Sequence, residues 1–216
     1  MLVILSSCQK KDNSLEFEKN VMSEILTDLV DSIYFDIRLM PLSKNPYLEK
    51  GISDSLKNEK IKRHQIAIAK REKRIIEIKN DTSRIVIAVF DTIYTESLLK
   101  GPEIIKYNNI EYLFDFITKK IEYKIDLNKI SKSDKFRFKY LSGFPNDKTI
   151  WKTKYPFYFG GVISFSRIQF DKNKKYGLLD AGITYADQDG EGFRIYIKKD
   201  INNKWIIEKI EGTWVT

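Results

Sequence analysis

The side chains that most often carry chemistry are scarce in this chain of 216 residues, which holds one cysteine, Cys8, and one histidine, His64. Neither an intrachain disulfide nor a cysteine-rich zinc site can form, and a Ser-His-Asp or Cys-His arrangement would have to use His64. His64 lies in the most charged stretch, and no Gly-x-Ser-x-Gly motif is present to expose a serine. The sequence therefore disfavours nucleophilic catalysis, and we expect no cofactor.

One acidic stretch has the spacing of a calcium-binding loop. In "DQDGEG", residues 187–192, Asp187, Asp189 and Glu191 alternate and a glycine falls sixth, as in an EF-hand. The twelfth position, which should hold a bidentate glutamate, is Lys198, and the flanks are typical of strands. The stretch favours a polar hairpin turn, with a weak calcium site as the alternative.

Any hydrolytic chemistry would have to use other carboxylates. Asp91, Glu96, Glu111 and Asp180 are of the type that glycosidases pair as acid and base, which requires a fixed separation across a cleft. The sequence does not give that separation. A small carboxylate-based hydrolase is therefore an alternative to a protein without catalytic activity.

Two arginines are candidate contacts for an anion. Arg167 and Arg194 lie in or beside predicted strands, where an unpaired buried charge would be destabilising. We expect both to be exposed or paired with Asp180 or Glu208. Recognition of an anion or carboxylate is the alternative.

Aromatic residues gather beside two glycines in "YPFYFGG", residues 155–161, which include Tyr158. Rings at the start of a strand favour a place in the core. A stacking surface for sugars or peptides, with Tyr158 as a contact, is the alternative.

The elements that must position these residues begin with an N-terminal helix. Every fourth residue from Val21 to Ile33 is apolar, which predicts an amphipathic helix over residues 14–41. We expect Ser14 to cap it and Pro41 to end it. Its polar face is acidic, which favours packing on a sheet over binding to an anionic membrane.

Positive charge is concentrated in residues 57–74, where eight Lys or Arg accompany two Glu, within a chain of net charge +8. Residues 54–74 favour a solvated helix or flexible segment, and contact with anionic headgroups is an alternative. Nucleic-acid binding is a further alternative, which applies only if the protein is not exported.

The remaining chain is rich in β-branched residues. Residues 74–80 and 83–94 predict strands, the second in a central position because its apolar run is continuous. Residues 109–120 have helical spacing and predict a short helix.

Four strand-like runs follow at residues 160–170, 176–185, 192–199 and 204–215, separated by short polar turns. They predict a four-stranded antiparallel meander, and we expect Trp205 and Trp214 to close its core. The fold class is therefore α+β, with the N-terminal helix packed on a mostly antiparallel sheet.

The N-terminal stretch "LVILSSCQKKDNS", residues 2–14, joins an apolar run to two serines and Cys8. Leu5-Ser6-Ser7-Cys8 resembles the lipobox of bacterial lipoproteins at all four positions. The resemblance implies cleavage before Cys8, lipid on its sulfur and acylation of the new amino group. Only seven residues precede Cys8 and none is basic, so we expect either a signal peptide that begins upstream of Met1 or no signal.

The C-terminal strands carry a second resemblance. Three motifs, Ser166-Arg167-Ile168-Gln169-Phe170-Asp171, Asn203-Lys204-Trp205 and Trp214-Val215-Thr216, follow the pattern of the C-terminal halves of uncharacterised exported bacterial lipoproteins. This similarity implies a shared scaffold and no particular chemistry.

These patterns predict a truncated signal, lipidation site and tether at residues 1–13 and a single α+β domain over 14–216. We expect a lipoprotein of the bacterial envelope, anchored in the membrane through Cys8 and facing the periplasm or the exterior. It would act as a non-catalytic binding or accessory module. An envelope protein or a glycan would bind to the sheet or its loops.

Overall fold

The computed structural model describes residues 13–46, 51–94, 104–107, 110–113 and 121–216. The chain divides into two compact units. One unit comprises Met1–Ile33 and Ile85–Thr216, and the other comprises Tyr34–Arg84.

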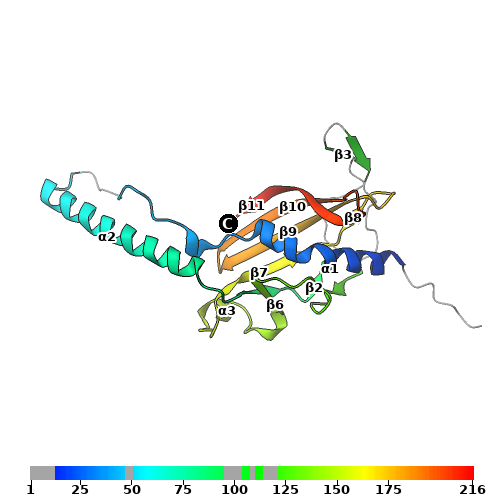
Figure 1. Ribbon diagram of the computed structural model, residues 1–216, viewed down its shortest axis with the longest axis horizontal. Coiled ribbons are helices and arrows are strands. Elements are labelled where there is room, and N and C mark those ends of the chain that lie inside the picture. The colour runs from blue at the N-terminus through cyan, green and yellow to red at the C-terminus, as the bar shows by residue number, and fades with distance from the viewer. Residues whose placement is uncertain (1–12, 47–50, 95–103, 108–109, 114–120) are drawn as a thin grey trace, which may run out of the picture. The chain divides into compact units, whose positions relative to one another are not determined.

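A seven-stranded mixed sheet organises the larger unit (Figure 1). Its order is β11-β10-β9-β7-β1-β6, with β8 beside β9. The strands are β1 (Ile85–Val89), β6 (Phe136–Tyr140), β7 (Phe159–Phe165), β8 (Gln169–Phe170), β9 (Tyr176–Ala186), β10 (Asp189–Lys199) and β11 (Trp205–Val215). In this sheet β1 is parallel to β6 and β7, and the other pairings are antiparallel. The α+β class, the central apolar strand and the C-terminal meander are confirmed.

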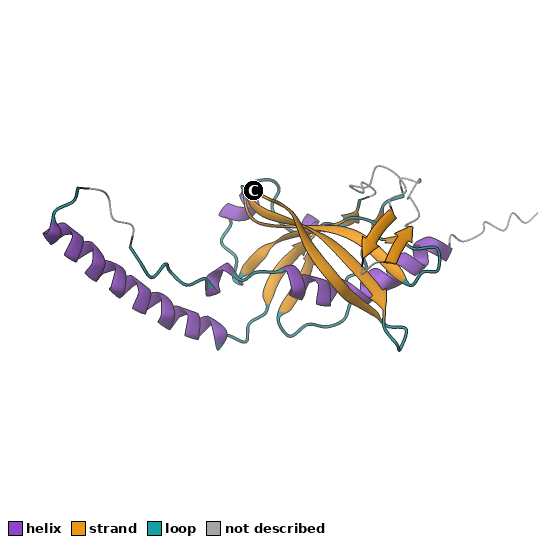
Figure 2. Ribbon diagram, turned by 90° about the horizontal axis from the view of Figure 1, so that it is seen from above, coloured by secondary structure: helices purple, strands orange, loops and turns teal. Residues whose placement is uncertain are grey.

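Helix α1 (Asn13–Ile33) packs on one face of the sheet and contacts β11 (Figures 1 and 2). The predicted apolar stripe is its buried side, from Val21 at 2% exposure to Ile33 at 5%. At the start of β11, Trp205 is buried and its backbone N–H donates to the Glu24 carboxylate at 2.9 Å. Hydrophobic burial between helix and sheet thus forms the main core.

Both predicted ends of α1 are wrong. The helix ends at Ile33 rather than at Pro41, and Ser14 lies within its first turn rather than before it. A physical reason for the early end is Asp36, whose carboxylate accepts from the Arg38 backbone N–H at 3.0 Å. This local bond caps the separate short 3-10 helix η1 (Ile37–Leu39), and such side-chain bonds compete with a continuous helix.

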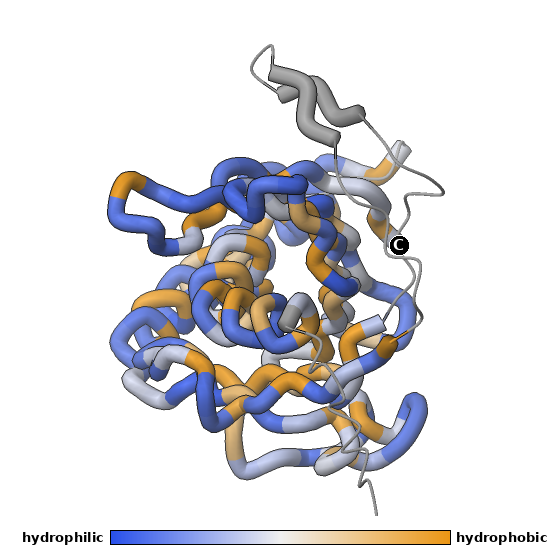
Figure 3. The backbone as a smooth tube through the Cα atoms, turned by 90° about the vertical axis from the view of Figure 1, so that its right-hand side faces the viewer, coloured by the Kyte–Doolittle hydropathy of each residue, from blue (hydrophilic) through white to orange (hydrophobic). Residues whose placement is uncertain are grey.

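The opposite face of the sheet is covered over β1 by the chain that connects β6 to β7. This connection contains η2 (Leu141–Gly143) and the short helix α3 (Thr149–Lys152). Its Phe144 and Ile150 form a second apolar cluster with Val86, Ala88 and Val162 of the sheet, and Tyr155, Phe157 and Phe159 pack against it. The predicted core role of the aromatic stretch is therefore confirmed for these three rings. Hydrophobic and hydrophilic positions alternate along much of the chain, and several outlying loops are mostly hydrophilic (Figure 3).

Two small sheets complete the larger unit. β2 (Thr92–Ile93) pairs with β5 (Tyr123–Lys124), and β3 (Ile104–Tyr107) pairs with β4 (Ile110–Leu113). The helix predicted over 109–120 is wrong at residues 110–113, and 114–120 lie outside the described residues. Pairing with β3 decides the conformation there, because an apolar run this short fits either period.

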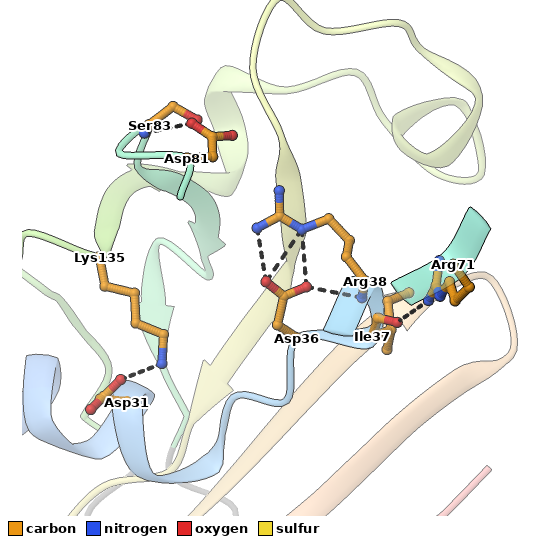
Figure 4. A network of polar contacts seen from close by, with 8 residues as sticks. All are labelled: Asp31, Asp36, Ile37, Arg38, Arg71, Asp81, Ser83 and Lys135. Atoms are coloured by element: carbon orange, nitrogen blue, oxygen red, sulfur yellow. Dashed lines mark hydrogen bonds and ion pairs between the residues drawn. The ribbon is translucent and has the colours of Figure 1, made fainter. Parts of the chain in front are cut away.

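The unit Tyr34–Arg84 is built from η1 and the long helix α2 (Asp54–Lys79). Of the two structures expected for residues 54–74, a solvated helix or a flexible segment, the helix is the one observed. The Arg71 guanidinium donates to the carbonyl oxygens of Met40 and Ile37 at 2.9 and 3.1 Å (Figure 4 shows the contact with Ile37). The strand predicted at residues 74–80 is wrong, because no residue breaks the helix before Asn80 and helical context outweighs β-branched propensity. None of the helices in the described part of the chain is long and apolar enough to cross a membrane.

A buried ion pair attaches α1 to the sheet. Glu18 of α1 is 2% exposed and Arg167, just after β7, is 8% exposed. The guanidinium Nε lies 2.8 Å and Nη2 2.5 Å from Oε2 of the carboxylate. The Ile168 N–H donates to Glu18 Oε1 at 3.0 Å, and Arg167 Nη1 donates to the Ile121 carbonyl at 3.0 Å. We call this group the clamp; hydrogen bonds to both charged partners compensate for much of their desolvation.

We expect Arg167→Met to lower the free energy of unfolding by about 3–5 kcal/mol, because it leaves the Glu18 carboxylate buried without its counter-charge. Urea denaturation would measure the loss. The matched control is Lys135→Met, which removes the pair with Asp31 (2.6 Å; Figure 4), whose side chains are 49% and 58% exposed. That change should lower the free energy by less than about 1 kcal/mol. Equal losses in the two variants would contradict the structural role of the clamp.

Candidate functional site

The sheet face opposite α1 carries polar side chains where the β6–β7 connection does not cover it. Side chains alternate along a strand, so the buried Ile183, Ile195 and Ile197 point to the α1 side and their neighbours point away. We call this uncovered region the open face. It comprises Ser164 of β7, Asp180, Gly182 and Thr184 of β9, Gly190, Gly192, Arg194 and Tyr196 of β10, and Lys209, Glu211 and Trp214 of β11.

Trp214 lies flat on the open face, across three glycines. Gly192 is in register with Trp214 on one side and with Gly182 on the other. A Cβ on Gly192 would overlap the indole Nε1, Cε2 and Cδ1, and a Cβ on Gly182 or Gly190 would lie 3.3 or 3.4 Å from ring carbons. One face of the indole rests on the backbone, yet Trp214 is 44% exposed. The prediction that Trp214 closes the core is therefore wrong, whereas Trp205 is buried as predicted.

A hollow of about 480 Å³, which we call the first hollow, lies between the sheet and the β6–β7 connection. Its apolar wall consists of Phe90, Leu141, Pro145, Ile150, Trp151 and Val162. Its polar groups are Asn146, Asp147 and Thr184. A mostly apolar hollow with a few polar groups is the usual composition of a small-molecule site.

The second hollow, of about 250 Å³, is bordered by Trp214 and Tyr94, with Ser164, Ser166, Asp180 and Gly182 among its other walls. It adjoins the first, because Val162 pairs with Thr184 and Ser164 pairs with Gly182 two residues along the same strands.

The charged groups of the open face are paired with one another, either between neighbouring strands or along one strand. Arg194 Nε donates to Asp180 Oδ1 at 3.1 Å, and both side chains are 19% exposed. Glu211 forms an ion pair with Lys209 and accepts from the Tyr196 hydroxyl at 2.9 Å. The Lys209 hydrogen bond, supported by Tyr196, holds the pKa of Glu211 below its usual value despite partial burial. The open face therefore carries paired charges.

The arginines predicted as anion contacts have different places. Arg194 lies on the open face and pairs with Asp180, as one prediction held. Arg167 is neither exposed nor paired with Asp180 or Glu208, because it is buried against Glu18 in the clamp. A guanidinium whose three nitrogen atoms all donate to Glu18 or to the Ile121 carbonyl has a structural role.

Tyr158 is not among the residues that line either hollow. Its carbonyl oxygen accepts from the backbone N–H of Val86 at 2.9 Å, which begins the pairing of β7 with β1.

The acidic turn does not gather metal ligands. Asp187 lies in the turn between β9 and β10 and pairs with Lys148 at 2.6 Å, and Asp189 and Glu191 belong to β10. No group of three or more His, Cys, Asp or Glu residues within the described ranges could hold a metal ion. The hairpin turn predicted there is confirmed.

The carboxylates considered for hydrolysis do not meet in either hollow. Asp180 is the single carboxylate lining the second hollow, and Asp147 is the single one lining the first. Glu96 lies outside the described residues, as does the side chain of Glu111.

Asp91, the remaining candidate, fastens the end of β1 to η2. Its carboxylate accepts from the Ser142 N–H at 2.9 Å, the Ser142 hydroxyl at 2.7 Å and Lys124 Nζ at 3.2 Å. Partial burial alone would raise the pKa of Asp91, but these hydrogen bonds outweigh it and hold the pKa below its usual value of 3.8. Asp91 thereby positions Phe90 and Leu141 at the first hollow.

Sequence reasoning expected a partner to bind to the sheet or its loops but did not single out the open face. Its one local signal was the alternation of Gly190 and Gly192 inside a strand, which indicates a close approach by another group. The group that approaches these glycines is the side chain of Trp214, which belongs to β11. Cys8 lies outside the described residues.

Comparison of the chain with models of known protein families, with curated proteins and with solved structures finds no match.

We expect Gly192→Ala to displace the Trp214 indole, because the added methyl group would occupy the position of the ring. In the chain labelled with 5-fluorotryptophan, one of three fluorine NMR resonances should move, and Trp214→Phe would assign it. Gly212→Ala is the matched control on the neighbouring strand, since a Cβ there has nothing within 4 Å. Identical spectra for the two alanine variants would contradict the flat placement of the ring.

Asp91→Asn should lower stability at neutral pH and have little effect in acid. A carboxylate whose pKa is depressed on folding stabilises the folded state above its unfolded pKa, and this contribution is lost as the pH falls through the folded pKa. The difference in thermal midpoint between wild type and variant should therefore shrink as the pH falls below 3.8. A difference that is constant from pH 7 to pH 2.5 would contradict this role.

Proposed function

We propose that the protein is a non-catalytic binding module of the bacterial envelope, held on the membrane by a lipid on Cys8, and that its open face binds the partner. The exposed indole of Trp214 carries this proposal. Large aromatic side chains left half in solvent beside hollows are typical of binding surfaces.

The arrangement of polar groups favours binding over catalysis. Each hollow is lined by one carboxylate, whereas glycoside hydrolysis requires two at a defined separation. Asp180 is held by Arg194, and Ser166 Oγ accepts from the Asp180 N–H at 2.8 Å and donates to the Arg167 carbonyl at 3.0 Å. Groups fixed in this way present a rigid polar surface, and none of them is an activated nucleophile.

The short tether supports a position close to the bilayer. α1 begins at Asn13, five residues after Cys8, and five residues of extended chain span at most about 18 Å. A lipidated Cys8 would therefore hold the start of α1 near the membrane surface.

Nucleic-acid binding is the second candidate, and α2 is the observation that favours it. The helix carries nine Lys or Arg and four Asp or Glu, and none of its residues is buried. Such a surface attracts phosphate groups. This candidate applies only to an unlipidated protein in contact with nucleic acid.

Intact mass spectrometry of the detergent-extracted protein, expressed from its native locus with the upstream region, tests the anchor. We expect a chain that begins at Cys8 and carries diacylglycerol and acyl groups, and Cys8→Ser should abolish this mass and release the protein from membranes. A chain that retains residues 1–7 and a free Cys8 thiol would overturn the proposal. The nucleic-acid candidate would then be tested first.

A further inference from the structure

We propose that the open face binds a neutral saccharide chain, with one sugar ring stacked on the Trp214 indole. This inference rests on the proposed binding function and names its ligand class. Four properties of the site support it: the geometry of the indole, the groups around it, the charge balance and the adjoining hollow.

The indole presents one flat apolar surface. Its inner face lies on the backbone of Gly192, so only the outer face is available to a ligand. The C–H face of a pyranose ring is flat and apolar, while its hydroxyl groups point outward around the rim. Stacking buries both apolar faces and leaves the hydroxyl groups to meet polar side chains.

Polar groups suited to hydroxyl groups lie beside the ring. Trp214, Ser164 and Asp180 line the same hollow. A carboxylate oxygen accepts from a sugar hydroxyl, and a serine hydroxyl both donates and accepts. Arg194 fixes Asp180 at 3.1 Å, so this acceptor is oriented before the ligand arrives.

The charge balance favours a neutral ligand. On the open face Arg194 pairs with Asp180 and Lys209 pairs with Glu211, so each positive group is matched by a negative one. An anionic ligand such as a phosphate or an acidic peptide would require unmatched positive charge, and a hydroxyl-rich neutral ligand does not.

The first hollow favours a chain over a single sugar. It adjoins the second hollow along β7 and β9 and offers the ring of Trp151 with the polar Asn146 and Asp147. Phe90 of the first hollow packs edge-on against Tyr94 of the second, with ring centres 5.7 Å apart. Two adjoining apolar hollows with polar groups suit two successive sugar units.

The test uses the full chain labelled with 5-fluorotryptophan and four neutral hexasaccharides: chitohexaose, cellohexaose, laminarihexaose and maltohexaose. We expect at least one to shift the Trp214 fluorine resonance in a saturable manner. Trp214→Ala should weaken its binding, measured by calorimetry, by at least about tenfold. Ile201→Ala, which removes a 98% exposed apolar side chain in a turn away from the open face, should leave the affinity unchanged. Circular dichroism would verify that each variant is folded.

Absence of saturable binding by all four saccharides at 10 mM, or binding that survives Trp214→Ala, would overturn the inference. If Cys8 nevertheless carries lipid, the ligand class is wrong while the anchored binding module stands. If a saccharide binds through Trp214 and Cys8 is unmodified, the inference stands and the proposed location fails.

Discussion

The clamp between Glu18 and Arg167 is the interaction on which the arrangement of this protein depends. Two charges are removed from water, and the Ile168 N–H and the Ile121 carbonyl complete their hydrogen bonding. Hydrophobic contacts are non-directional and would allow α1 to slide along the sheet. A bidentate buried pair constrains both distance and direction, so the clamp fixes where α1 lies along the face that its apolar stripe covers.

Because α1 covers one face of the sheet, the opposite face is the one whose side chains can contact solvent. The β6–β7 connection shields the other face only over β1 and its neighbours, so β9, β10 and β11 are left with one side toward solvent. An antiparallel meander accommodates this by alternation, with isoleucines inward and charged pairs outward. Cross-strand pairs such as Asp180 with Arg194 then fix the outward side chains in place. The rigid polar surface of the open face follows from the same register that forms the core.

Local sequence patterns correctly predicted the elements in which buried residues recur at the regular spacing of a helix or a strand. The stripe from Val21 to Ile33 and the four C-terminal strands were predicted because each pattern repeats along its own segment. Residues 74–80 were misassigned because β-branched side chains suit a strand locally, whereas the helix that begins at Asp54 continues to Lys79. The partner of Arg167 lies 149 residues away along the chain, and no spacing rule reaches that far. The flat placement of Trp214 was missed for the same reason, since it depends on the register of three strands.

At the glycines beneath Trp214, the residue types that favour a strand locally differ from those that the packing of the indole on the sheet requires. Glycine in a strand destabilises it by about 0.5–1 kcal/mol relative to alanine, and Gly182 and Gly192 stand side by side on adjacent strands. An indole laid across them restores apolar contact on its inner face, which offsets part of this cost. This contact does not explain why the outer face of the ring is left in water. An aliphatic side chain would cover the same backbone and expose less apolar surface. Departures from local rules of this kind concentrate at functional sites. The exposed outer face of the ring is therefore a feature of the open face that stability alone does not explain.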